Sequence, residues 1–233
     1  MCHCKRSGFL KPVHCVNINM TIQRNSPKTC GFTKIELLVV LLVCCILAGL
    51  LFACLRSPRQ VSSRLTCTVN LKQMGVAAQL FSQSYGGYPW AVSTNSGGTL
   101  EFGAMGEQTF RHLQVLSNDI YVTVVVVCPQ DVRQRAPNWL SMANSNISYF
   151  IGIDSNPALP TSIVAGDRNI TQMSGVVLES VLSAPPKWVK SVGLHGIKGN
   201  LLFSDGHVEK VSSAGLRKAL LRTGIVTNHF SIP

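Results

Sequence analysis

Residues 31–55 read GFTKIELLVVLLVCCILAGLLFACL and carry one acidic residue, Glu36, at the start of an otherwise apolar run. The run from Leu37 to Leu55 has 19 residues, about 28 Å as a helix, which matches the hydrocarbon thickness of a bilayer. An ionised carboxylate there costs at least ~2.5 kcal/mol, so an intramembrane acid by default has a function and a charge partner. The stretch predicts a membrane-spanning helix at 37–55 with a functional Glu36. The simpler alternative is a plain signal anchor with an incidental acid.

The same stretch resembles the signal of type IV prepilins and type II secretion pseudopilins. In that family a glycine at the cleavage point precedes Phe-Thr, two further residues, a glutamate and an uninterrupted apolar helix, as it does here. The resemblance implies that a membrane-embedded prepilin peptidase cuts between Gly31 and Phe32 on the cytoplasmic side and methylates the new amine of Phe32. It also implies that Glu36 complements the N-terminal charge of a neighbouring subunit during assembly. Lys34 is a departure, because the family usually carries an apolar residue there.

Positive charge is concentrated ahead of this signal. The formal net charge is +11, and five basic residues but no acidic ones precede Gly31. Without residues 1–31 the chain keeps 16 basic and 10 acidic residues, scattered without a basic helix or stacking platform, so no nucleic-acid partner is expected. Basic residues before the apolar run favour a cytoplasmic N-terminus. We expect residues 1–31 to be a cleaved basic leader, and Met20 is an alternative start that shortens it to 12 residues.

The nine cysteines fall into three regions. Two of these regions are the leader and the apolar run, where thiols act as small hydrophobic groups; they hold Cys2, Cys4, Cys15, Cys30, Cys44, Cys45 and Cys54. Cys67 and Cys128 lie in the part expected to be exported, an oxidising setting in which a pair tends to be bonded. Two alternatives stay open for this pair: a disulfide that closes a loop of about 60 residues, or two reduced buried thiols.

Beyond the apolar run the sequence predicts a second helical half and then a sheet. Arg59 to Tyr85 has mostly helical apolar spacing and ends at Gly86-Gly87, so the N-terminal helix is expected over 32–86, with Pro58 bending it or interrupting one hydrogen bond. Residues 87–233 are enough for one globular domain. Its expected strands are 120–127, 148–153, 163–170, 200–203 and 207–211, and its short helices 103–116 and 215–221. The fold class is α+β with an antiparallel sheet, and the resemblance implies a pilin-like fold.

A second motif lies near the C-terminus. His195 is separated by nine residues from Asp205-Gly206, and this H-x9-DG spacing resembles an element that accompanies prepilin-type anchors in some bacterial lineages. Asp-Gly favours a tight hairpin turn, which His195 would hydrogen-bond, unless it caps the preceding loop. The other interpretation is a divalent-ion site formed by His195, Asp205 and His207, in which two imidazoles suit zinc or another transition metal better than calcium.

Enzyme motifs are weak in this chain. Ser180, His195 and Asp205 are the residue types of a hydrolase triad, but no nucleophile elbow surrounds Ser180. Asp167-Arg168 is equally consistent with a surface ion pair and a catalytic pair. The chain has no Walker, dinucleotide-binding or zinc-protease motif. We therefore expect neither an enzyme nor a resident cofactor, apart from the divalent-ion alternative.

Two classes of function compete. The first is a pseudopilin-like structural subunit of a type II secretion or type IV pilus-like filament, whose implied partners are prepilin peptidase, other pilin or pseudopilin subunits and membrane lipid. Such a protein would be a single-pass inner-membrane protein with a cytoplasmic N-terminus and a C-terminal domain in the periplasm or, within the filament, outside the cell. The second is a membrane-tethered exported binding module that does not polymerise and takes a sugar, a surface polymer or a partner protein as ligand.

Overall fold

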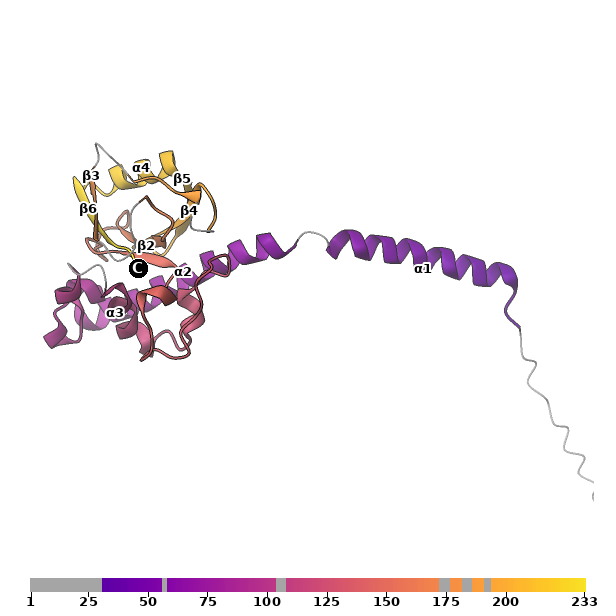
Figure 1. The fold of residues 1–233 in the computed structure, drawn as a ribbon, viewed down its shortest axis with the longest axis horizontal. Coiled ribbons are helices and arrows are strands. Elements are labelled where there is room, and N and C mark those ends of the chain that lie inside the picture. The colour runs from indigo at the N-terminus through magenta and orange to yellow at the C-terminus, as the bar shows by residue number, and fades with distance from the viewer. Residues whose placement is uncertain (1–30, 56–57, 104–107, 172–176, 182–185, 191–193) are drawn as a thin grey trace, which may run out of the picture. The chain divides into compact units, whose positions relative to one another are not determined.

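The computed structural model describes residues 31–55, 58–103, 108–171, 177–181, 186–190 and 194–233 (Figure 1). The chain divides into two compact units, Met1–Cys54 and Leu55–Pro233, and each is described by itself. The expected leader, including the alternative start at Met20, lies outside the described residues except for Gly31.

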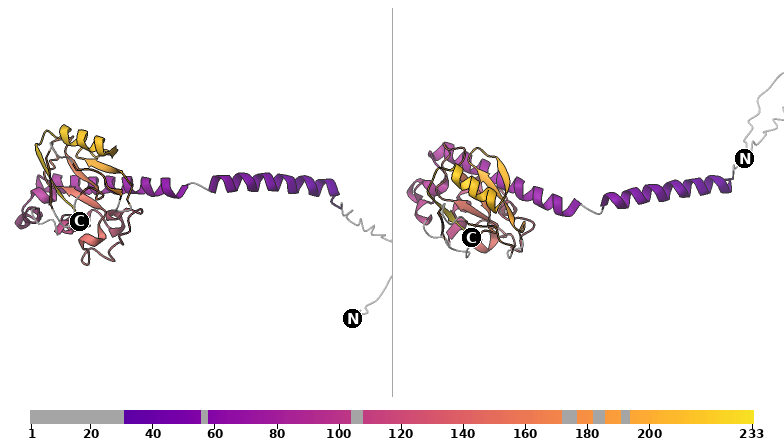
Figure 2. Two further views of the ribbon diagram at one scale, coloured as in Figure 1. Left: turned by 45° about the horizontal axis from the view of Figure 1, so that its top comes forward. Right: turned by 90° about the horizontal axis from the view of Figure 1, so that it is seen from above.

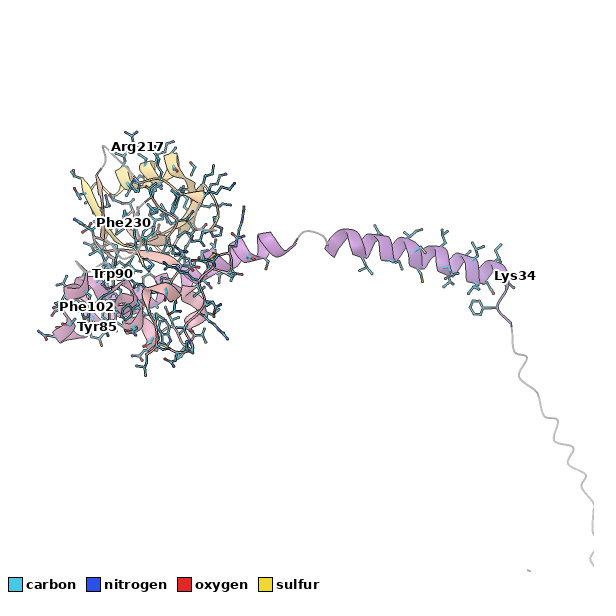
Figure 3. All side chains as sticks on the ribbon, viewed as in Figure 1. Lys34, Tyr85, Trp90, Phe102, Arg217 and Phe230 are labelled. Atoms are coloured by element: carbon cyan, nitrogen blue, oxygen red, sulfur yellow. A yellow bond between two sulfur atoms is a disulfide. The ribbon has the colours of Figure 1, made fainter. Side chains whose placement is uncertain are left out.

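The first unit contains helix α1, Lys34–Leu55. Residues 34–51 are all exposed, and the apolar side chains cover every side of the helix. A helix that is apolar all round needs either a protein core or a membrane around it. Among the described residues, α1 is the helix that is long and apolar enough to cross a bilayer, as the sequence predicts. Figure 3 labels Lys34 at its first turn.

The second unit begins with helix α2, Pro58–Tyr85. The helix expected over 32–86 is described as two helices, α1 and α2, and Pro58, which was expected to bend it or interrupt one hydrogen bond, is the first residue of α2. Proline suits that position because its missing N–H would have no helical partner there. The predicted end of the helix at Gly86-Gly87 is confirmed. The Gly86 N–H donates to Ser82 O at 2.8 Å, and the positive φ of Gly86, +79°, ends the helix in the left-handed region.

Six strands form one sheet in the order β3-β6-β1-β2-β4-β5, and every neighbouring pair is antiparallel. The strands are β1 Tyr149–Gly152, β2 Ile163–Asp167, β3 Val177–Val181, β4 Lys198–Phe203, β5 Val208–Ser212 and β6 Thr227–Ser231. The α+β class and its antiparallel sheet are confirmed. Of the predicted strands, 148–153, 163–170 and the hairpin pair are present, whereas β3 and β6 were not predicted.

Both faces of this sheet are covered by helices. Tyr149, Ile151 and Leu202 pack with α2, whereas the alternate residues Phe150, Leu201 and Phe203 pack with α4, Ser213–Arg222. In Figure 1 α4 lies above the strands and α2 below them, and in the view from above in Figure 2 α4 lies in front. Figure 3 labels Phe230 on the α4 side of the sheet and Trp90 on the side of α2. The central strands are therefore buried on both sides.

The segment between α2 and β1 is built from short helical turns. They are η1 Pro89–Ala91, η2 Thr94–Ser96, η3 Leu100–Phe102, α3 Thr109–Gln114, η5 Val115–Asn118, η6 Thr123–Val126 and η7 Asn144–Asn146. The predicted strand at 120–127 is wrong. Its Val127 N–H closes a turn onto Val124 O, and Val127 O accepts from the Asn70 side chain, so the backbone finds partners without a neighbouring strand. Ile120, Val125, Val126 and Val127 are buried in the core on the α2 side, whereas Val122 and Val124 are exposed.

His112 in α3 is a buried titratable group on this side of the protein. Its Nδ1 lies 2.7 Å from Thr99 Oγ1, and its Nε2 has no partner among the described residues. Its ring meets Trp90 edge-on at a centroid distance of 6.2 Å. Burial lowers the pKa of His112 to about 4, because the charged imidazolium would lose its hydration.

This shift makes the stability of the second unit depend on pH. Because the folded pKa of about 4 is below the unfolded value of ~6.5, the unfolded chain binds a proton that the folded chain does not, and stability falls as pH drops through that window. We expect His112 to account for a loss of about 3 kcal/mol between pH 6.5 and pH 4. Urea unfolding at several pH values should show that His112→Gln removes this part of the pH dependence. Equal slopes for the variant and the wild type would contradict the assignment.

Candidate functional site

The predicted processing segment immediately precedes α1. The Thr33 N–H donates to Glu36 Oε2 at 2.9 Å, and the Glu36 N–H donates to Thr33 Oγ1 at 3.3 Å. This reciprocal pair is a capping box, which satisfies two of the backbone donors that a helix leaves open at its N-terminus. The helix dipole also favours a negative charge in the first turn. The Glu36 carboxylate therefore has a hydrogen-bond partner, Thr33, in its own chain.

The bond that prepilin peptidase would cut lies just outside this capping box. Gly31 and Phe32 precede the helix, and Phe32 is 76% exposed. Cleavage between them would leave the Thr33 N–H as an amide, so both hydrogen bonds of the box would persist in the shortened chain. Helix α1 would therefore stay capped after cleavage before Phe32.

Cys67 and Cys128 are joined by a disulfide, so of the two alternatives left open by the sequence the structure contains the bonded pair. The bridge links α2 to the segment after η6 across 61 residues, and both residues are fully buried. Cys44 and Cys45 in α1 are free and exposed.

His195 lies against this disulfide. Its Nε2 is 3.6 Å from Cys128 Sγ and 3.5 Å from Asp167 Oδ2, and both side chains of the His195–Asp167 pair are almost completely shielded from solvent. The Asp167 Oδ2 accepts hydrogen bonds from the backbone N–H of Asn200 at 2.7 Å and from its side-chain Nδ2 at 3.0 Å. Asp167 Oδ1 and His195 Nδ1 are buried without a partner among the described residues. The core on the α2 side thus holds a polar cluster of Cys67, Cys128, His195, Asp167 and Asn200.

Burial favours the neutral forms of both titratable side chains in this cluster. It raises the pKa of Asp167 to about 7, although the two hydrogen bonds from Asn200 act in the opposite direction. It lowers the pKa of His195 to about 4, and the positive charges of Arg64 and Lys210 lower it further. At mildly acidic pH the arrangement is a neutral carboxyl group beside a neutral imidazole.

The two ends of the H-x9-DG element attach β4 to α2 at separate points. His195 contacts the disulfide that includes Cys67, while at the turn after β4 the Ser204 O accepts from Gln79 Nε2 at 2.8 Å. Twelve helical residues from Cys67 to Gln79 span about 18 Å. The six strand steps from Lys198 to Ser204 span about 20 Å. The helix segment Cys67–Gln79 and the strand segment Lys198–Ser204 are therefore similar in length.

The predicted tight turn at Asp205-Gly206 is present between β4 and β5, but two other expectations for this motif are wrong. His195 does not hydrogen-bond the Asp205 turn, because it lies beyond the opposite end of β4; Asp205 Oδ1 accepts instead from the backbone N–H of His207 at 3.0 Å and contacts its Nδ1. Gly206, with φ +84°, supplies the left-handed turn residue. His195, Asp205 and His207 therefore do not form one metal site. The suspected triad is not assembled either, since three strands separate Ser180 in β3 from β4.

Asp167 and Arg168 do not pair with each other. Asp167, the last residue of β2, enters the polar cluster, while Arg168 follows the strand and pairs elsewhere. Arg168 Nε and Nη2 donate to Asp131 Oδ2 and Oδ1 at 2.8 Å and 2.7 Å, a bidentate ion pair. Asn200 and Asp131 were not predicted as partners of these two residues.

Two of the surface grooves that border α2 among the described residues differ in their lining. One, of about 390 Å³, leads to the polar cluster and is lined by His195, Asn200, Arg64 and Lys210 among others. The other, of about 410 Å³, is mainly apolar and includes Val69, Val76, Leu80 and Tyr121.

Comparisons with protein families, with curated proteins and with solved structures found no match for this chain. Its function is therefore argued from its own residues.

Proposed function

We propose that the protein is a pseudopilin-like structural subunit of a type II secretion or type IV pilus-like filament. In this proposal it is cut between Gly31 and Phe32 by prepilin peptidase and is held in the inner membrane by α1. The observation that carries the proposal is the junction at Thr33–Glu36, where a capped helix start with a single acid leads directly into an apolar helix of membrane-spanning length.

Glu36 would pair with a neighbouring subunit through Oε1, the carboxylate oxygen that the capping box does not use. Oε2 accepts the Thr33 N–H, and Oε1 has lone pairs for the N-terminal ammonium of Phe32 on a neighbouring chain. In a low-dielectric setting each ion alone is costly, so breaking such a pair strongly disfavours the assembly. The capping box would hold the acid at the depth where the neighbour's amine arrives.

The second unit supports a pilin-like architecture for this proposal. A long helix, α2, packs its buried side against one face of an antiparallel sheet. Its other side keeps apolar residues in solvent, with Leu65 63%, Val76 57% and Leu80 46% exposed. An exposed apolar helix face of this kind suits lateral packing between subunits. The proposal places that face against further copies or related subunits.

Mass spectrometry of the membrane-extracted protein tests the processing step. We expect the mature chain to begin at Phe32 with a methylated amine, because the segment before α1 presents the Gly31–Phe32 bond outside the helix. A mature protein that retains residues 1–31, or one released as a soluble domain cut after Leu55, would refute the proposal.

Substitutions at the capping box separate charge pairing from helix capping. Glu36→Gln keeps the box, since glutamine also serves at this position, but removes the charge; we expect cleavage to proceed and cross-linked oligomers to be lost. Thr33→Ala removes the cap at a cost of about 1 kcal/mol while keeping the charge, and should still assemble. Normal oligomers from Glu36→Gln would favour the alternative, a tethered binding module that does not polymerise.

A further inference from the structure

We propose that the polar cluster beneath the Cys67–Cys128 disulfide is a transition-metal site in the reduced protein. Cys67, Cys128 and His195 would be three ligands, and Asp167 the fourth. The disulfide and the metal complex would then be alternative states of one cluster. The inference is independent of whether the protein assembles into filaments.

The geometry fits tetrahedral coordination. The two Sγ atoms and one imidazole nitrogen lie within 4.8 Å of one another. Ligand atoms about 2.0–2.3 Å from a tetrahedral zinc ion are separated from each other by roughly 3.3–3.8 Å. The separation between His195 Nε2 and Cys128 Sγ, 3.6 Å, is in that range. The bonded sulfurs alone are too close together, so the metal can enter only after the disulfide opens.

Asp167 has the position and the free carboxylate oxygen that a fourth ligand requires. Its Oδ2 lies 3.5 Å from His195 Nε2 and accepts both hydrogen bonds from Asn200. Its Oδ1 is buried without a partner among the described residues, as a metal ligand would be before the ion arrives. Asn200 would be the outer-shell residue that fixes the carboxylate, a role that such hydrogen bonds commonly have. Two thiolates, an imidazole and a carboxylate suit zinc or cobalt rather than calcium.

The surroundings allow the ion to enter and balance the charge. The groove of about 390 Å³ lined by His195 and Asn200 leads toward the cluster from the surface. With two thiolates, one carboxylate and a divalent ion, the site carries one net negative charge. Arg64 and Lys210 line the same groove and would compensate it.

The reaction needs a dithiol reductant. A dithiol donates two electrons and two protons to the Cys67–Cys128 bond, which becomes two thiols while the reductant becomes a disulfide. Binding of the divalent ion then displaces one proton from each thiol and, from the neutral form of Asp167, the carboxyl proton. A disulfide oxidant reverses the sequence: it accepts two electrons from the Cys67 and Cys128 thiolates, takes up two protons from solvent to become a dithiol, and leaves the Cys67–Cys128 disulfide and the released ion.

Cobalt absorbance tests the proposal on the full chain in detergent, with its seven other cysteines changed to serine. After anaerobic reduction and removal of the dithiol we expect one Co²⁺ per chain, with the thiolate charge-transfer and intense visible bands of tetrahedral cobalt, displaced by Zn²⁺. The oxidised form of the same chain should show neither band. Absence of the bands in the reduced chain would overturn the proposal.

Three variants assign the ligands in the same assay. His195→Gln and Asp167→Asn should each weaken cobalt binding at least about tenfold. The matched control is Asp205→Ala with His207→Ala, which removes the exposed pair at the hairpin turn and should leave binding unchanged. Bands that persist undiminished in His195→Gln, or that disappear in the hairpin control, would overturn the assignment. Zinc should also raise the unfolding midpoint of the reduced wild type, which provides a second readout where a variant is poorly folded.

Discussion

Reduction of the Cys67–Cys128 disulfide is expected to lower the free energy of unfolding of the second unit by about 4 kcal/mol. The bridge closes a loop across 61 residues, and in the chain-entropy model its loss restores that much freedom to the unfolded chain. The disulfide joins α2 to the segment that precedes β1, so its reduction removes a covalent link between the helix and the part of the chain that leads into the sheet. For a unit of this size the loss corresponds to a fall of roughly 10 °C in Tm.

The measurement compares thermal unfolding with and without a reductant, in the presence of a chelator so that no metal ion occupies the reduced cluster. A chain in which Cys44 and Cys45 are serine should show the same sensitivity, because these two thiols are free in α1. A Cys67→Ala chain should show none. Equal midpoints for the oxidised and reduced wild type would contradict the predicted contribution of the bridge.

Local patterns predicted the elements whose chemistry is local. The span of α1 follows from an unbroken apolar run, the end of α2 from Gly86, and the β4–β5 hairpin from Asp205-Gly206, whose glycine has φ +84°. Each depends on side chains and backbone angles within a few residues. The structure agrees with these predictions because no distant partner is needed to decide them.

The predictions that failed required knowledge of distant partners. The valine run before Cys128 has the composition of a strand, but α2 provides its burial and Asn70 provides one of its hydrogen bonds, 57 residues away. His195 was paired with the turn that follows it, whereas its neighbours are Cys128 and Asp167. Strand-sized apolar runs and single histidines have many acceptable environments, and tertiary packing selects among them.

Glu36 belongs to a capping signal that was present in the sequence but was not predicted from it. Thr33-Lys34-Ile35-Glu36 before an apolar run has the spacing of a capping box, and the structure forms it. The acid was expected either to pair with a neighbouring subunit or to be incidental, and its capping role was not predicted. A residue can serve both purposes, so a substitution that keeps the cap but removes the charge is more informative than alanine.

Arg168→Ala is expected to destabilise the second unit by about 4 kcal/mol. The Asp131 carboxylate is fully shielded from solvent, and both of its oxygens accept from the Arg168 guanidinium. Burial by itself would raise the pKa of Asp131, but the hydrogen bonds and charge of Arg168 outweigh it and hold the pKa below its ordinary value. Removing the arginine leaves a buried charge that loses its paired cation and keeps only weaker partners such as the Arg133 backbone N–H, 3.4 Å from Oδ1, and breaking such a pair typically costs ~3–5 kcal/mol.

The pH dependence distinguishes this mechanism from a simple loss of packing. In the wild type, the lowered pKa of Asp131 contributes stability above its unfolded value, and that contribution is lost as pH falls below it. In Arg168→Ala burial raises the pKa instead, so the stability deficit of the variant relative to the wild type should shrink as pH falls from 7 toward ~4. Urea unfolding across this range, with Asp131→Asn combined with Arg168→Ala as the control, should show this shrinking of the deficit only where the carboxylate remains. A deficit in Arg168→Ala that is constant with pH would mean that the arginine acts through packing rather than through its charge on Asp131.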